Sequence, residues 1–170
     1  MTHWPLQRDC PTFYGNPDPD GDGVPNRAWE DANLVRVVPP WQMVLAWDVS
    51  KPLKSIRVHK AVAPSLERIL GVIWARAGAS QDHMEILRLH LFGGAYTFRR
   101  MRGGHRLSMH SYGCAIDLDP EANPMGRPWK PRFGMSMIAI EAFEQEGWVW
   151  GGRWSGEDCD PQHFQAARVR

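Results

Sequence analysis

The chain has 170 residues, of which 43% are hydrophobic and 23% are charged, and its formal net charge is +1. This length fits one domain with a single core, and both shares are ordinary for a globular protein. A net charge so close to zero gives no electrostatic reason to expect a nucleic acid or an anionic membrane as partner. We therefore expect residues 1–170 to form one domain that binds no nucleic acid. The domain is also expected to be monomeric.

The N-terminal sequence MTHWPLQR lacks the charged start and apolar stretch of a secretory signal. No run approaches the roughly eighteen apolar residues that a membrane-spanning helix needs. Synthesis in the cytoplasm without membrane insertion is expected, with any export by another route. The three cysteines, Cys10, Cys114 and Cys159, have neither a disulfide framework nor zinc-finger spacing, which favours reduced thiols.

Residues 1–40 are rich in Pro, Gly and Asp, which predicts an irregular segment that wraps around the rest of the domain. Within it, Asp18, Asp20 and Asp22 alternate and Gly23 is sixth, which resembles the start of a calcium loop. The twelfth position is Trp29 instead of an acid, and no helix is expected before the loop. A solvated acidic loop is therefore favoured over a calcium site.

Short strands are expected at residues 43–47 and 56–59. The clearest helix begins near Pro64, carries one apolar stripe from Leu66 to Ala77, and ends at Gly78. Alternating leucines then predict a half-buried strand over residues 87–91. The glycines at 93 and 94 would end that strand, and residues 95–99 would form its partner.

The second half of the chain predicts a strand at 114–118 and a second amphipathic helix from Met135 to Gly147. Two further strands are expected at 148–150 and 163–165. Together these elements predict an α+β fold, with a small antiparallel sheet, two main helices and long loops.

The most specific segment runs from Ser108 to Asp117. His110 and Asp117 are seven residues apart, so on one continuous strand they would point to opposite faces. They can converge only if the chain turns between them, and Ser111-Tyr112-Gly113 suits a turn. A carboxylate such as Asp117 within an apolar strand is costly unless it is paired or bound to a metal.

A second cluster, Asp160-Pro-Gln-His163, places an acid and an imidazole within one turn. Two histidines and one carboxylate make a plausible three-ligand catalytic zinc site with the fourth position open for water. Asp160 would then be a general base, because zinc lowers the pKa of its water to about 7. Asp119 is a weaker candidate for the metal ligand than Asp117, because a strand-ending turn before Pro120 explains an acid at that position. Asp158 is a weaker candidate for the general base than Asp160, because it lacks the Asp-x-x-His spacing to His163.

The remaining histidines are more typical of exposed or loop positions than of metal ligands. They are His59, His83, His90 and His105. Only His90 lies on the polar face of an expected strand.

These motifs resemble those of the D-alanyl-D-alanine carboxypeptidase and L-alanyl-D-glutamate endopeptidase family of zinc peptidases, which includes many phage endolysins. That family carries Ser-x-His-x-x-Gly-x-Ala-x-Asp, followed later by Asp-x-x-His, and both motifs are complete here. The segment from Trp148 to Trp154 is similar to the Trp-Gly-Gly-Asp-Trp segment of the endopeptidase branch, although Arg153 replaces the acid. Similarity extends upstream through residues 13–15 and 93–99.

The resemblance implies a fold like that of the D-Ala-D-Ala peptidases and the hedgehog signalling domain. It also implies that His110, Asp117 and His163 bind Zn²⁺ and that Asp160 is the catalytic base. Arg99 matches an arginine that stabilises the oxyanion, and its neighbours Arg100 and Arg102 are close enough to compete for that role.

The expected activity is cleavage of the peptidoglycan stem peptide, with the L-alanyl–D-glutamate bond favoured by the Trp-Gly-Gly segment. A D-alanyl-D-alanine carboxypeptidase is the nearest alternative. A non-catalytic cell-wall-binding module is a second alternative, but it would need neither Asp160 nor Arg99, so the presence of both residues argues against it. An iron(II) oxygenase is a third alternative, and the His-x-Asp spacing that such enzymes use is missing here. The expected setting is the cell wall, reached by release from the cytoplasm as for a phage-type lysis enzyme.

Overall fold

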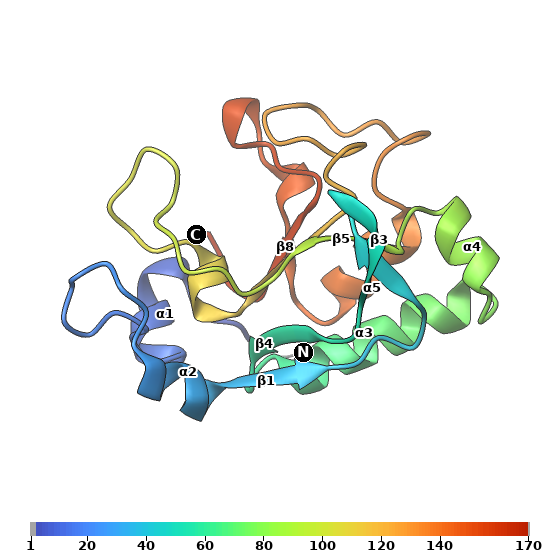
Figure 1. The fold of residues 1–170 in the computed structure, drawn as a ribbon. Helices are drawn as coiled ribbons and strands as arrows, with labels where there is room; N and C mark the ends of the chain where they lie inside the picture. Colours follow the sequence, from blue (N-terminus) through green and yellow to red (C-terminus); the bar gives the residue numbers. More distant parts are fainter. Residues whose placement is uncertain (1–2, 170) are drawn as a thin grey trace.

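The structure is a computed structural model that describes residues 3–169. A main sheet of six strands has the order β3-β2-β5-β6-β8-β7, and β1 pairs with β4 in a separate two-stranded sheet (Figure 1). The strands are β1 (Leu34–Val37), β2 (Met43–Leu45), β3 (Asp48–Leu53), β4 (Ile56–His59), β5 (Leu91–Gly94), β6 (Ala115–Leu118), β7 (Val149–Trp150) and β8 (His163–Gln165). The α-helices are α1 (Cys10–Phe13), α2 (Arg27–Asn33), α3 (Ala63–Arg76), α4 (Gln81–Ile86) and α5 (Met137–Gln145).

The predicted α+β class is confirmed, and so are the two main helices. α3 and α5 pack against each other and end before Gly78 and Gly147, whose φ angles of 73° and 80° are the left-handed values that glycine tolerates best. Phe143 of α5 stacks on Phe164 of β8, with ring centroids 4.1 Å apart. The helical core therefore supports β8 directly.

Most strand pairs of the main sheet are antiparallel, as expected, and one pair is parallel. β2 and β5 run parallel, with Val44 opposite Leu91, and β5 in turn pairs antiparallel with β6. The long connection that a parallel pair needs runs from β2 through β3, β4, α3 and α4 to β5.

The strand predicted at residues 87–91 is wrong. The Ser80 side chain accepts a hydrogen bond from His83 N and so caps α4, and Arg88 then adopts a left-handed φ of 58°. β5 begins only at Leu91 and includes Gly93, the residue expected to end a strand. A Cβ on Gly93 would lie 3.0 Å from Asp117 O, so glycine allows β5 to approach β6 closely.

Residues 95–99 form no strand, contrary to the prediction, because β2 and β6 already pair with β5 on its two edges. An isolated bridge between Arg100 and Leu107 closes the loop that follows. The first forty residues are also more regular than predicted. They contain α1 and α2, and they end in β1, which pairs with β4.

The first and last described segments lie together. Leu6 forms a parallel bridge with Arg168, and the Tyr14 hydroxyl donates a hydrogen bond of 2.7 Å to Ala166 O. Over residues 3–169, no helix has the length and apolar character required to span a bilayer.

Candidate metal centre

A single turn carries His110 toward Asp117, as the motif spacing predicts. The Ser108 side chain accepts a hydrogen bond from His110 N and caps the short 3₁₀ helix η2 (Met109–Tyr112). Gly113 ends η2 with a φ of 66°, and β6 begins two residues later. A Cβ on Gly113 would lie 2.7 Å from His59 N, so only glycine fits between η2 and β4.

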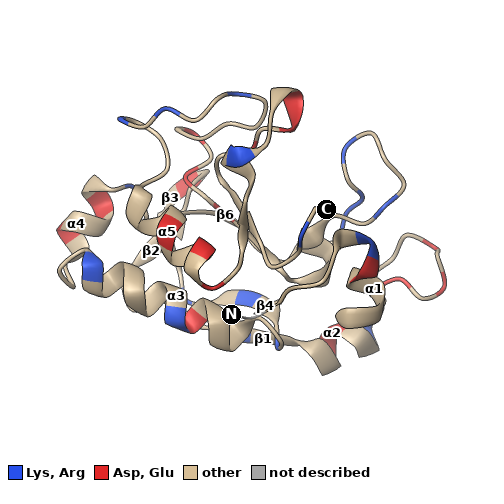
Figure 2. Cartoon of the chain, turned by 180° about the vertical axis from the view of Figure 1, so that it is seen from behind, with Lys and Arg blue, Asp and Glu red and all other residues tan. Residues whose placement is uncertain are grey.

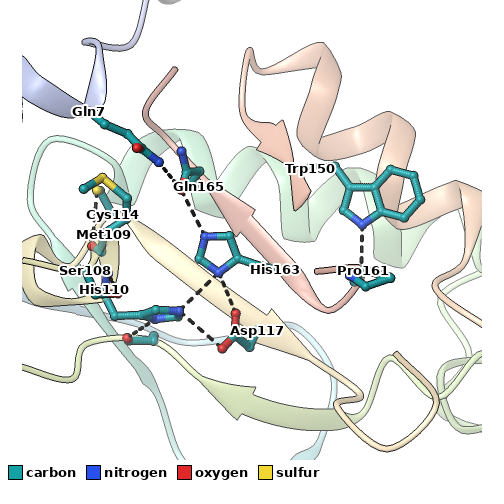
Figure 3. Close-up of polar contacts among 11 residues, drawn as sticks. Gln7, Ser108, Met109, His110, Cys114, Asp117, Trp150, Pro161, His163 and Gln165 are labelled. Atoms are coloured by element: carbon teal, nitrogen blue, oxygen red, sulfur yellow. Dashed lines mark hydrogen bonds and ion pairs between the residues drawn. The ribbon is translucent and has the colours of Figure 1, made fainter. Parts of the chain in front are cut away.

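Strand pairing supplies the third residue, because Asp117 of β6 lies directly opposite His163 of β8. His163 Nδ1 is 2.8 Å from Asp117 Oδ1, and His110 Nε2 is 3.2 Å both from His163 Nδ1 and from Asp117 Oδ2 (Figure 3). Within residues 3–169, these three residues form the one group of three or more metal-binding side chains whose ligand atoms all lie within 4.8 Å of one another.

The outer ring nitrogens of both histidines are engaged elsewhere. His110 Nδ1 lies 2.6 Å from Ala95 O, which makes it a donor and leaves the lone pair on Nε2. His163 Nε2 lies 3.1 Å from Gln165 Oε1, and Gln165 Nε2 donates to Ala167 O, which fixes the orientation of the amide. The nitrogens that face Asp117 are therefore the ones free to bind a metal.

Zinc fits this arrangement. Ligands about 2.0–2.1 Å from a tetrahedral zinc lie about 3.3 Å from one another, close to the observed separations of 2.8–3.2 Å. Three lone-pair atoms at such distances repel one another unless a proton or a cation lies between them. The group consists of two imidazoles and one carboxylate, as in catalytic zinc sites.

The three side chains change one another's acidity. Burial raises the pKa of Asp117, but the hydrogen bonds from His110 and His163 outweigh burial and hold that pKa well below its usual range. Burial lowers the pKa of His163, but its hydrogen bond to Asp117 and that negative charge dominate and raise the pKa. Asp117 and His163 thus stabilise each other's charged forms.

Asp160 lies at the edge of this group. Its carbonyl accepts a hydrogen bond from His163 N, so the predicted shared turn is present, and its own N donates to Gly151 O. Its Oδ1 is buried and has no hydrogen-bond partner among the described residues. Burial raises the pKa of Asp160 despite the opposing charge of His163. A Cβ on Gly151 would lie 2.5 Å from Asp160 O, which explains the first glycine of the Trp-Gly-Gly segment.

The arginines occupy different environments. Arg99 is exposed, and the Ser111 hydroxyl fixes its backbone by accepting from Arg99 N and donating to Arg99 O. In the described part of the chain, the Arg99 guanidinium has no hydrogen-bond or ion-pair partner. Arg153, in contrast, is paired with Glu144 of α5 through two of its guanidinium nitrogens.

The competing acids are accounted for. Asp119 accepts two hydrogen bonds from Arg88, at 2.8 and 2.7 Å, which leaves it paired outside the metal group. Asp158 is exposed.

The acidic loop differs from the prediction at Asp18. Asp18 is buried, not solvated as expected, and Gly23 N donates to its Oδ2. Over residues 3–169 the acidic loop does not bring three carboxylates together.

Two supporting residues escaped sequence reasoning. Gln165 orients His163, and its position two residues later on the same face of one strand was the available signal. The partner of His110 is the backbone oxygen of Ala95, which no side-chain pattern reveals.

Comparison with known families adds independent support. Residues 102–166 match the D-alanyl-D-alanine carboxypeptidase family model. The matched segment is less than half of the chain, but it contains His110, Asp117, Asp160 and His163. Searches of curated proteins and of solved structures found no match. The match over this segment supports a peptidase.

Proposed function

We propose that this protein is a zinc-dependent peptidase that cleaves the peptidoglycan stem peptide between L-alanine and D-glutamate. The observation that carries the proposal is the convergence of His110 Nε2, His163 Nδ1 and the Asp117 carboxylate. The outer nitrogens of both imidazoles are held by fixed acceptors, and the ligands lie within the segment that matches the peptidase family.

The roles of the surrounding residues follow from their environments. A zinc ion held by the three ligands would polarise the scissile carbonyl and bring the pKa of its water to about 7. Asp160 Oδ1, which has no partner among the described residues, would accept a proton and return it to the leaving amine. The free guanidinium of Arg99 would donate to the substrate oxygen as negative charge develops there.

The choice of bond rests on local sequence. Similarity of the Trp148–Trp154 segment to the endopeptidase branch supports the L-alanyl–D-glutamate bond. The description of the matching family model supports D-alanyl-D-alanine carboxypeptidase activity as a second candidate. Arg153 departs from the endopeptidase pattern, and its pairing with Glu144 indicates that it holds this segment against α5.

The test is to incubate the zinc-loaded protein with purified peptidoglycan and to identify the products by mass spectrometry. We expect new L-alanine C-termini and D-glutamate N-termini. Asp160→Ala should lower turnover at least a hundredfold, whereas Asp158→Ala, which changes an exposed neighbour, should not. Released D-alanine would instead establish the carboxypeptidase. Muropeptide binding without cleavage would favour a binding module.

We also propose that the protein is monomeric and acts on the cell wall after release from the cytoplasm. The support for the cell wall is the description of the matching family model, a D-alanyl-D-alanine carboxypeptidase. Finding the native protein only in the cytosol of intact cells, away from wall turnover or lysis, would contradict this location.

A further inference from the structure

A cavity of about 420 Å³ lies beside η2, apart from the metal-binding group. The loop of residues 100–107 forms one wall, and the 3₁₀ helix η1 (Gln7–Asp9) and the acidic loop before α2 form the others. Figure 1 places these loops next to one another at the end of the molecule that carries α1, and Figure 2 shows basic stretches on one loop and acidic stretches on the other.

Three arginines line this cavity. Arg8 comes from η1, and Arg100 and Arg106 come from the 100–107 loop. Arg100 gives one N–H to His105 O, and Arg8 makes only a long exposed contact of 3.7 Å with Asp9. Over residues 3–169, the Arg106 side chain has no hydrogen bond or ion pair. These guanidinium groups thus have donors left for a planar anion, and carboxylates suit their forked geometry.

One acidic side chain faces the same cavity. Asp18 is only 8% exposed, and its Oδ2 accepts a hydrogen bond of 3.3 Å from Gly23 N. Its Oδ1 is buried and has no partner in the described part of the chain. A buried carboxylate oxygen without a donor favours a ligand that supplies one. The cavity therefore combines sites for a carboxylate with a site for an ammonium group.

The cavity shares structural elements with the metal-binding group. Met109 lines it and precedes His110 in the chain. Gln7 also lines it and donates to Gln165 Oε1, the same oxygen that accepts from His163 (Figure 3). Through these contacts the cavity adjoins the outer side of the metal-binding group, where Gln165 holds His163.

We propose that this cavity binds an amino-acid end that bears a carboxylate and an ammonium group on one carbon. In peptidoglycan the unlinked end of a diaminopimelate side chain has this chemistry, whereas a lysine side chain lacks the carboxylate. Arg8, Arg100 and Arg106 bind the carboxylate, and Asp18 receives the ammonium. The inference rests on the proposed function, and it makes this cavity the determinant of preference for diaminopimelate-containing stem peptides.

The experiment compares two tripeptides, L-alanyl-γ-D-glutamyl-diaminopimelate and L-alanyl-γ-D-glutamyl-lysine. Calorimetry on the zinc-loaded Asp160→Ala protein gives their dissociation constants without turnover. We expect about tenfold tighter binding of the diaminopimelate peptide, and about tenfold weaker binding of that peptide after Arg8→Gln or Arg106→Gln. The lysine peptide should not respond to either change. Arg132→Gln, an exposed arginine that does not line the cavity, is the matched control.

Equal affinities for the two tripeptides, no measurable binding of the diaminopimelate peptide, or unchanged binding in both arginine variants would overturn the inference. Circular dichroism of each variant checks that it is folded. Parallel digestion assays with the unmodified protein separate the two proposals. Cleavage of both peptides with equal kcat/KM would leave the peptidase standing and remove the cavity's role. No cleavage of any stem peptide would remove the peptidase, while the binding constants would still decide what the cavity binds.

Discussion

His163 shows how this centre is organised at the level of single residues. Its Nδ1 faces Asp117 at 2.8 Å, and its Nε2 faces Gln165 at 3.1 Å. Gln165 is itself held by Ala167 O, so both the rotation and the tautomer of the His163 ring are fixed. Such outer partners increase the basicity of a ligand and orient it before the metal binds.

Replacing Gln165 should therefore weaken zinc binding without removing a ligand. We expect Gln165→Met, which keeps the size but loses the acceptor, to lower zinc affinity about ten- to a hundredfold. Gln165→Glu keeps an acceptor and should recover most of that loss. Competition with a chromophoric chelator measures the affinities. Equal zinc affinity in the Met variant and the unmodified protein would show that the Gln165 contact has no role at the metal.

At this scale the sequence was informative where side chains form the contacts. The positions of His110, Asp117 and His163 were predicted from spacing and resemblance, and the structure brings the three together. His59 was expected to be exposed or in a loop, and this is wrong, since it is 3% exposed at the end of β4. The local sequence could not reveal this burial, because the buried ring is hydrogen-bonded to the backbone oxygen of Tyr14, which is distant in the chain.

Among the elements, the η2–β6 turn matters most for the site. Gly113 has a φ of 66°, and a Cβ there would lie 2.7 Å from His59 N and 2.8 Å from a Leu34 methyl carbon. The turn is thus pressed against β4, which keeps His110 and Asp117 at a fixed separation.

Gly113→Ala should lower the free energy of unfolding by about 2 kcal/mol or more, because left-handed strain and a backbone clash add. Gly103→Ala is a matched control, since Gly103 has a φ of 71° but a Cβ added there would meet no atom within 4 Å. It should cost only about 1 kcal/mol. Urea denaturation measures both values, and similar losses in the two variants would argue against a tight contact at Gly113.

The elements also show where a periodic pattern misleads. Leu87, Leu89 and Leu91 alternate with polar residues, which is typical of a strand, yet the first two lie in the turn after α4. Arg88 reverses the chain there and is held by Asp119, thirty-one positions away. A local period cannot reveal a pairing at that separation, whereas the α3 and α5 stripes depend only on neighbouring turns of one helix.

For the whole molecule, His59 connects stability to pH. Burial lowers its pKa to about 4, and this effect exceeds the opposing hydrogen bond with Tyr14 O. Because the unfolded chain binds a proton at His59 near pH 6.5 and the folded chain only near pH 4, stability falls as the pH falls between these values.

The expected loss from His59 between pH 7 and pH 4 is about 3 kcal/mol of unfolding free energy. His59→Gln should remove this part of the pH dependence, whereas His105→Gln, at an exposed position, should leave it unchanged. Denaturant titrations in the presence of a chelator measure the effect without a contribution from zinc release. An unaltered pH profile in the His59 variant would contradict the assignment.

The pairing of β6 with β8 has a consequence for biosynthesis. Ribosomes release His110 and Asp117 well before His163, which is fifty-three residues later than His110. Until β8 emerges and pairs with β6, the nascent chain offers a metal ion two of its three ligands, and the outer partner Gln165 is also missing. A metal ion would therefore find all three proposed ligands together only at the final stage of synthesis, so a growing chain could not gain the proposed activity before its fold is complete.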